Sequence, residues 1–93
     1  MEMGIRGKVA LVTGASRGLG AGICQSLAEE GVTIIGCARS GSALESVIAS
    51  LPNGPHHYIC QDLSKEGATK NLIIKVNEIT NCPDIIVNNV GGN

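Results

Sequence analysis

The chain has 93 residues and a formal net charge of −1, and only 1% of its residues are aromatic. This length allows one small domain at most and lies below the usual size of an α/β domain. The scattered charges and the lack of aromatic side chains for base stacking argue against a nucleic-acid-binding module, and no apolar run approaches the ~20 residues that span a bilayer.

The first patterned segment is an apolar strand, Lys8–Thr13, which ends in a glycine-rich turn. A continuous apolar run is typical of a buried parallel strand. The next segment, Gly18–Glu30, predicts a helix that Gly31 ends. The apolar residues that mark its buried face recur every fourth position: Leu19, Ile23 and Leu27.

A second strand and a second helix follow. Val32–Ala38 is rich in β-branched residues and predicts a strand. Ser42–Leu51 predicts a helix, which Pro52 prevents from continuing. Its apolar residues at helical spacing are Leu44, Val47, Ile48 and Leu51. A Pro-Asn-Gly-Pro turn comes next.

The remaining segments repeat this alternation. His57–Gln61 is a short strand, Ser64 is the predicted N-cap of a third helix, and Asp84–Asn88 is a fourth apolar strand. The third helix carries Ala68, Leu72, Val76 and Ile79 at helical spacing. Strands and helices that alternate across short loops predict an α/β fold of βαβαβαβ order, with a parallel sheet and right-handed crossovers.

The turn after the first strand has the chemistry of a phosphate site. It reads Thr13-Gly14-Ala15-Ser16-Arg17-Gly18-Leu19-Gly20. Glycines let the chain bend sharply and let its backbone approach a ligand. The helix that begins here offers free N–H groups and the positive end of its dipole to a phosphate. An ordinary strand-to-helix turn of another α/β protein is the alternative interpretation.

The glycine spacing differs from the G-x-G-x-x-G fingerprint. Thr-Gly-x-x-x-Gly-x-Gly resembles the cofactor loop of the short-chain dehydrogenase/reductase family. The resemblance covers essentially residues 1–93 but less than half of a family domain, which implies the N-terminal, cofactor-binding part of a truncated Rossmann-like domain. It also implies strand order 3-2-1-4, a ligand crevice between the first and fourth strands, and a homo-oligomeric full-length parent. The candidate ligands in this turn are Gly14, Ser16, Arg17, Gly18, Leu19 and Gly20.

The end of the second strand predicts which dinucleotide is bound. An acid about 20 residues past the glycines would accept hydrogen bonds from the ribose hydroxyls of NAD, but Ala38 stands here and Arg39 follows it. A guanidinium binds a 2′-phosphate that an acid would repel, and Arg17 is a second cation near this point. The pair resembles the NADP-preferring members of the family, so NADP(H) is the expected cofactor. Two solvated surface arginines are the alternative.

The third strand is followed by Asp62 and Leu63. The resemblance implies that Asp62 accepts a hydrogen bond from the adenine amino group, which suits an ionised carboxylate, and that Leu63 lines the ring. The alternative role of Asp62 is a cap for the helix expected near Ser64. The two roles are compatible.

The fourth strand ends in Asn88-Asn89-Val90-Gly91, which resembles the Asn-Asn-Ala-Gly of the family. The resemblance implies that Asn88 ties neighbouring strands through its amide and that Asn89 borders the cofactor ribose. Val90 departs from the usual alanine. Asn-x-Gly alone is a common turn, so the match depends on its place after an apolar strand.

Cysteine and histidine spacing predicts neither a disulfide framework nor a metal site. The cysteines are far apart, at Cys24, Cys37, Cys60 and Cys82. Cys37 and Cys60 fall in apolar strand patterns and are expected to be reduced core residues. His56 and His57 are adjacent, and neighbours on a strand point to opposite faces. No signal-peptide pattern begins the sequence, so a cytoplasmic location is expected.

The residues that carry out the family's chemistry are not in this sequence. The family uses a Tyr-x-x-x-Lys pair, a preceding Ser and an Asn; the Tyr is the acid/base and the Lys lowers its pKa. The only tyrosine is Tyr58, and Asp62 stands where the Lys would be. No catalytic residue is predicted, and a small carbonyl or alcohol substrate is expected only for a full-length parent.

Two classes of function remain open. The chain is either the NADP(H)-binding segment of an oxidoreductase that interconverts carbonyl compounds and alcohols, or a non-catalytic, truncated product that binds a nucleotide or a partner. Both need the same cofactor residues. Codons beyond Asn93 discriminate between them, because an in-frame continuation with Ser and Tyr-x-x-x-Lys selects the enzyme.

Overall fold

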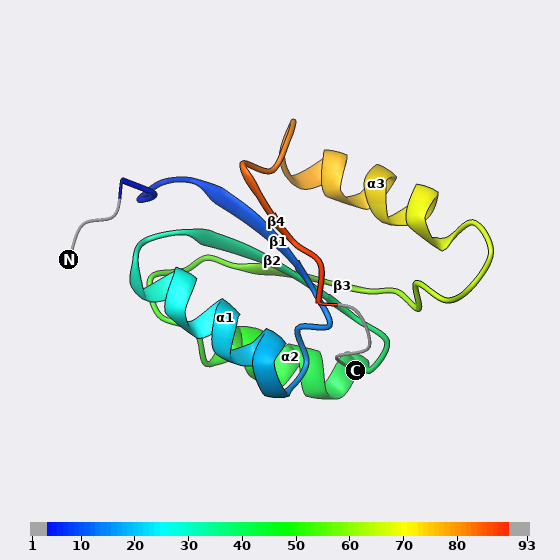
Figure 1. The fold of residues 1–93 in the computed structure, drawn as a ribbon, viewed down its shortest axis with the longest axis horizontal. Coiled ribbons are helices and arrows are strands. Elements are labelled where there is room, and N and C mark those ends of the chain that lie inside the picture. The colour runs from blue at the N-terminus through cyan, green and yellow to red at the C-terminus, as the bar shows by residue number, and fades with distance from the viewer. Residues whose placement is uncertain (1–3, 90–93) are drawn as a thin grey trace.

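The computed structural model describes residues 4–89 and contains a four-stranded parallel sheet with helices on both faces (Figure 1). The strands are β1 (Val9–Thr13), β2 (Thr33–Ala38), β3 (His57–Cys60) and β4 (Ile85–Val87). The helices are α1 (Gly18–Glu29), α2 (Gly41–Ala49) and α3 (Ala68–Ile79). α1 and α2 cover one face of the sheet and α3 covers the other. Every predicted element is present, and the ends agree to within one or two residues except at the start of α3.

The strand order is β3-β2-β1-β4 and all neighbouring strands are parallel, as predicted. β1 lies inside the sheet, where Leu11 is opposite Ile35 of β2 and Ile86 of β4. The order reverses at β1, because β2 and β3 extend the sheet on one side and β4 on the other. Parallel strands bring their carboxyl ends to one edge, and a ligand site of an open α/β sheet lies at such a reversal.

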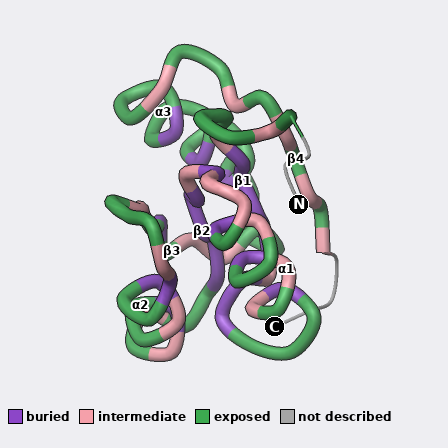
Figure 2. The backbone as a smooth tube through the Cα atoms, turned by 90° about the vertical axis from the view of Figure 1, so that its left-hand side faces the viewer, coloured by how far each residue is buried: buried purple, intermediate pink, exposed green. Residues whose placement is uncertain are grey.

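Two apolar clusters hold the layers together, and Figure 2 shows buried segments concentrated in the central strands. On the side of α1 and α2, Val12 and Ile34 pack with Leu44 and Ile48. The cluster on the side of α3 consists of Leu11, Ile35, Cys37, Ile59, Leu72 and Val76. Because successive strand residues point to opposite faces, β1 and β2 supply both clusters.

The buried face of α1 agrees only in part with the predicted one. Leu19 is 72% exposed, and Ile23 and Leu27 are only partly buried. The buried residues of the helix are small: Gly20, Cys24 and Ala28. At Gly20 the helix lies so close to the turn before it that a Cβ would meet the carbonyl oxygen of Gly14. Apolar spacing predicted the helix and the packing of Ile23 and Leu27 against the core correctly, and the burial of Leu19 wrongly.

α3 begins later than predicted, and Ser64 is not its N-cap. The N-cap is Gly67, with φ of 78°. Ser64 lies in a turn closed by Asp62, whose Oδ1 accepts hydrogen bonds from the Ser64 N–H at 3.0 Å and from its hydroxyl at 2.6 Å. This is a local Asx turn. Asp62 therefore does not cap α3, which excludes the alternative role considered for it.

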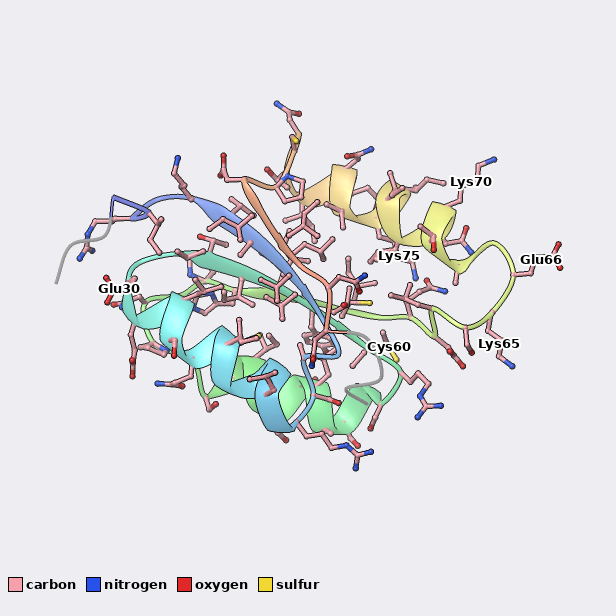
Figure 3. All side chains as sticks on the ribbon, viewed as in Figure 1. Glu30, Cys60, Lys65, Glu66, Lys70 and Lys75 are labelled. Atoms are coloured by element: carbon pink, nitrogen blue, oxygen red, sulfur yellow. The ribbon has the colours of Figure 1, made fainter. Side chains whose placement is uncertain are left out.

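Of the two cysteines predicted to be core residues, only Cys37 is buried. Cys60 is exposed at the end of β3, and its thiol donates a hydrogen bond to the backbone oxygen of Arg39 at 3.1 Å (Figure 3). Cys24 of α1 is the second buried thiol. Burial raises the pKa of Cys24 and of Cys37 to about 11, so both are neutral at physiological pH.

The approach of α1 to the β1–α1 turn generates a paired prediction. A Cβ on Gly20 would lie 1.9 Å from the carbonyl oxygen of Gly14, whereas nothing lies within 4 Å of a Cβ on Gly22 of the same helix. We expect Gly20→Ala to destabilise the fold by roughly 1–3 kcal/mol or more through overpacking. Gly22→Ala should stabilise it by about 0.5–1 kcal/mol through helix propensity. Urea unfolding of both variants measures the two effects, and shifts of the same sign would contradict the close approach.

β4 is an edge strand within the part of the chain that the structure describes, and it presents an apolar side chain. Ile86 is 66% exposed, on the face of the sheet to which Leu11 contributes. A strand edge with unpaired N–H and C=O groups is a template for pairing with another chain. A domain of this size also buries only about 60% of its unfolded surface. We therefore expect the 93-residue chain on its own to be poorly stable or to self-associate.

Sedimentation velocity tests this with two matched substitutions. Ile86→Lys should reduce self-association, because it places a charge on the edge strand. Ile74→Lys, at a half-exposed isoleucine of α3, should change it less. A compact monomer with a sharp, cooperative melting transition for the unmodified chain would contradict the expectation.

Candidate functional site

The residues predicted to bind a cofactor all lie at the carboxyl edge of the sheet. They come from the β1–α1 turn and the start of α1 (Gly14, Ser16, Arg17, Gly18, Leu19, Gly20), the end of β2 (Arg39), the loop after β3 (Asp62, Leu63) and the end of β4 (Asn89). The parallel order of the strands is what brings these distant segments to one edge.

The β1–α1 turn leads directly into the N-terminus of α1. Gly14 and Gly18 have φ of 62° and 60°, in the left-handed region that favours glycine. The N-cap, Arg17, has no side-chain cap hydrogen bond, and no acidic residue lies in the first turn. The first N–H groups of a helix have no partner inside it, so this end of α1 presents donors and a positive dipole end to an anion.

A hydrogen-bond network ties the end of β4 to this turn. The Thr13 hydroxyl donates to Asn88 Oδ1 at 3.0 Å and accepts from the Asn89 N–H at 3.0 Å. Asn89 Nδ2 donates to the backbone oxygen of Gly14 at 3.2 Å. The amide of Asn88 links neighbouring strands, as expected, and that of Asn89 holds the glycine turn. Val90 and Gly91, the rest of the predicted motif, lie outside the described residues.

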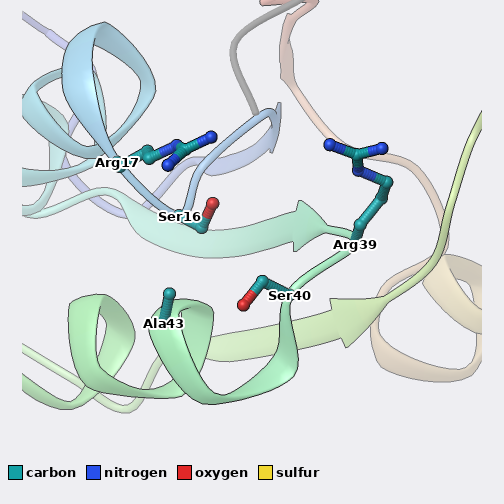
Figure 4. A pocket seen from close by; sticks show the side chains of 5 residues that line it. All are labelled: Ser16, Arg17, Arg39, Ser40 and Ala43. Carbon is teal, nitrogen blue, oxygen red and sulfur yellow. The ribbon is translucent and has the colours of Figure 1, made fainter.

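A pocket of about 150 Å³ lies between the β1–α1 and β2–α2 loops (Figure 4). It is lined by Ser16, Arg17, Arg39, Ser40 and Ala43. This volume is several times what a single water molecule needs, so the space admits a group of the size of a phosphate. The pocket brings together three predicted residues, Ser16, Arg17 and Arg39, from two separate loops.

The chemistry of the lining fits an anion. Two guanidinium groups border the pocket, and none of its lining residues is acidic. Ser16 is 6% exposed, and within residues 4–89 its hydroxyl has no hydrogen-bond partner. A buried hydroxyl without a partner carries a desolvation cost, and a bound phosphate oxygen would supply the missing acceptor. The residues present therefore fit a phosphate group.

Asp62, Leu63 and Leu19 lie at the same edge but do not line the pocket. Hydrogen bonds from Ser64 lower the pKa of Asp62, and Arg39 and Lys65 lower it further. Asp62 is therefore an ionised, pure acceptor at neutral pH. Leu63 and Leu19 are exposed apolar side chains, 37% and 72% respectively, available to a ligand larger than the pocket.

Ser40 and Ala43 are site residues that the sequence interpretation missed. The second helix was predicted to begin at Ser42, whereas Ser40 is its N-cap and Gly41 its first residue. Serine is a preferred N-cap residue, and this preference at the position after Arg39 was the available signal.

His56 has a structural role rather than a ligand role. Its Nδ1 accepts a hydrogen bond from the Ile34 N–H at 3.0 Å, and its Nε2 donates to the oxygen of Pro52 at 2.7 Å. Both ring nitrogens are therefore engaged. Across residues 4–89, no group of three or more His, Cys, Asp or Glu side chains is arranged to hold a metal ion, and none of the described helices has the length and apolar character needed to traverse a membrane.

Tyr58 lies on β3 away from the pocket. Its hydroxyl donates a hydrogen bond to Glu45 Oε2 at 2.8 Å, and this bond, with the charge of Glu45, raises the pKa of the tyrosine. An acid/base tyrosine needs its pKa moved toward the operating pH. The environment of Tyr58 raises its pKa and so moves it away from neutral pH.

Known proteins resemble this chain in both sequence and structure. The family model of short chain dehydrogenases matches residues 8–93. NADPH-dependent pterin aldehyde reductase of Arabidopsis thaliana is 34% identical over 88 residues, covering 94% of this chain and 36% of that protein.

Two solved structures share the arrangement of strands and helices. The RhlG/NADP active-site complex from Pseudomonas aeruginosa has a TM-score of 0.87 and 39% identity, over 94% of this chain and 36% of that one. L-sorbose reductase from Gluconobacter frateurii, complexed with NADPH and L-sorbose, has a TM-score of 0.91 and 33% identity, over 98% and 36%. The chain thus spans about a third of the length of the relatives it matches.

The glycine spacing of the β1–α1 turn, the strand order and the family match lead to the same conclusion. The chain belongs to the short-chain dehydrogenase/reductase family and corresponds to the N-terminal part of its Rossmann-like domain.

Proposed function

We propose that residues 1–93 are the NADP(H)-binding part of a short-chain reductase or dehydrogenase that interconverts a carbonyl compound and an alcohol. The single observation that carries this proposal is the pocket between two loops, in which Arg17 and Arg39 border a space that fits a phosphate. The pocket borders the N-terminus of α1, whose free N–H groups suit a pyrophosphate.

The charges at the end of β2 favour NADP(H) over NAD(H). Ala38 is buried at the end of the strand and offers no carboxylate to ribose hydroxyls. Arg39 and Arg17 offer planar, permanently charged donors that match a phosphate. In this proposal the 2′-phosphate of the cofactor lies in the pocket, and the adenosine ribose lies between the ends of β1 and β2.

The remaining residues of the edge have roles along the rest of the cofactor. The free N–H groups after Gly18 bind the pyrophosphate, and the exposed Leu19 contacts the cofactor beyond it. Asp62 accepts a hydrogen bond from the adenine amino group, and Leu63 lines the ring. Asn89 holds the turn carbonyl of Gly14 while its backbone borders the second ribose.

The nicotinamide ring of a bound cofactor supplies or accepts the hydride in this chemistry. The described residues orient the adenosine and pyrophosphate end through charge and backbone donors. Proton transfer to the substrate oxygen requires a positioned acid/base, and Tyr58 is bonded to Glu45 instead. Hydride transfer and substrate selection therefore belong to parts of a family domain other than these residues.

The cofactors of the relatives also support the assignment of NADP(H). The Arabidopsis thaliana relative is described as NADPH-dependent, and the two structural neighbours are complexes with NADP and NADPH. The same neighbour from Gluconobacter frateurii also binds L-sorbose. In this proposal the substrate is a carbonyl compound or an alcohol.

Cofactor preference is predicted to depend on Arg39. A charge-assisted hydrogen bond contributes roughly 1.5–3 kcal/mol, and 1.4 kcal/mol corresponds to about a tenfold change in affinity. In a full-length protein that carries these residues, Arg39→Ala should weaken NADPH binding by roughly 10- to 100-fold and leave NADH binding nearly unchanged. Ala38→Asp should weaken NADPH binding and strengthen NADH binding.

Dissociation constants for both cofactors, measured at one fixed salt concentration, check these changes. Lys8→Ala, a substitution at the opposite edge of the sheet, is the matched control for loss of a positive charge. If Arg39→Ala weakens NADPH and NADH equally, the arginine does not contact the 2′-phosphate and the NADP assignment loses its main support.

The 93-residue chain alone is predicted to show no turnover with any carbonyl or alcohol substrate. The reason is the lack of a Tyr-x-x-x-Lys pair in its sequence. NADPH oxidation by chain purified free of host reductases is the assay. Reproducible turnover that is lost on mutating a residue of this segment would contradict the prediction. If translation ends at Asn93 in the source transcript, the alternative role of a non-catalytic binding module is favoured.

A further inference from the structure

We infer that Gly36 of β2 is a positioning residue for cofactor preference, because the absence of a side chain at this position sets the separation of the two loops that border the pocket. This inference rests on the proposed function and deepens it by naming what fixes the geometry that NADP(H) would use. Gly36 does not itself line the pocket. It acts through the residues that pack on it.

Gly36 lies in a place where glycine is unfavourable. It is buried and is opposite Val12 of β1 and Tyr58 of β3, so it lies inside the sheet. Its φ is outside the left-handed region, so the backbone does not require a glycine. Glycine weakens the interior of a strand and often marks a position where another part of the chain approaches closely. Packing, rather than backbone conformation, therefore accounts for the glycine.

Three side chains occupy the space above Gly36. A Cβ at this position would lie 2.9 Å from Ile48 Cδ1, 3.2 Å from Leu44 Cδ1 and 3.2 Å from the Cβ of Ala15. All three neighbours are buried in one apolar cluster. Two of them belong to α2 and the third belongs to the β1–α1 turn. The helix and the turn therefore meet on the bare backbone of Gly36.

These contacts lie directly behind the pocket. Ala15 directly precedes Ser16 and Arg17, which form one wall. Leu44 directly follows Ala43, which belongs to the opposite wall. Figure 4 shows the two walls with the pocket between them. The width of the pocket is therefore set by how closely Ala15 and Leu44 approach β2.

Of the three neighbours, Ala15 transmits a change at Gly36 to the site. The ends of the two α2 side chains can rotate, whereas the Cβ of Ala15 moves only with its backbone. The Ala15 N–H donates a hydrogen bond to the backbone oxygen of Cys37 at 3.1 Å, which holds the turn on β2. Because a core has little free space, a methyl group at Gly36 should displace the turn and move Arg17 away from Arg39.

The test compares the dissociation constants of NADPH and NADH for a full-length family protein that carries these residues. Gly36→Ala should weaken NADPH binding roughly three- to tenfold, because a displaced Arg17 keeps only part of a charge-assisted hydrogen bond to the 2′-phosphate. NADH binding should change less than about twofold, since the pyrophosphate donors follow Gly18 on α1. Val76→Ala is the matched control for core packing. It removes volume on the α3 face of the sheet and should lower the melting temperature without changing the ratio of the two constants.

Two further backgrounds test whether the contact with Ala15 is responsible. Ala15→Gly removes the Cβ that the added methyl would meet, so in this background Gly36→Ala should no longer change the ratio of the two constants. Ile48→Val removes the atom nearest to the added methyl. Gly36→Ala/Ile48→Val should therefore fold even if Gly36→Ala alone does not. Its methyl still meets Ala15, so this variant should prefer NADPH less than Ile48→Val does.

The outcomes separate this inference from the proposed function. If Arg39→Ala removes the preference for NADPH while Gly36→Ala, alone or with Ile48→Val, leaves that preference unchanged, Gly36 is only a structural residue and the inference is overturned. A loss of preference that is equally large in the Ala15→Gly background also overturns it. If the unmodified protein does not prefer NADPH, both the inference and the proposed function are overturned.

Discussion

The close approach of α1 to the β1–α1 turn is the constraint on which the rest of the structure depends. The Gly14 carbonyl occupies the space that a side chain at position 20 would need. The same carbonyl accepts the amide of Asn89, which fixes the end of β4 beside β1. Helix, turn and two strands are thus held at one point, and the N-terminus of α1 is aimed along the carboxyl edge of the sheet.

The order of the strands and the two arginines at their carboxyl ends together form the site. Parallel strands in the order β3-β2-β1-β4 place the ends of β1 and β2 side by side. Arg17 from one loop and Arg39 from the next therefore border one pocket. β1 and β2 are each followed by a helix whose first N–H groups lack intrahelical partners, so two neighbouring helix ends face one edge. This arrangement matches an elongated ligand that carries phosphate at two places.

The sequence predicted the order of elements, the parallel sheet and most of the site, because glycine spacing and apolar runs are local signals. The prediction that Leu19 lies on the buried face of α1 is wrong. Leu19 fits the apolar period but is exposed, and Gly20 lies against the turn, where a Cβ would meet the Gly14 carbonyl. Ser40 and Ala43 were missed because they become site residues only when α2 packs beside the β1–α1 turn. That juxtaposition depends on tertiary packing, as at Gly36, where α2 side chains fill the space that a Cβ would need.

The most direct test is a crystal structure, with NADP⁺ bound, of a full-length family protein that carries these residues. The 2′-phosphate should lie in the pocket, within hydrogen-bonding distance of Arg17, Arg39 and the Ser16 hydroxyl, and the pyrophosphate should lie at the N-terminus of α1. A structure in which the adenosine ribose lies elsewhere, or in which the 2′-phosphate is solvated and touches neither arginine, would contradict it.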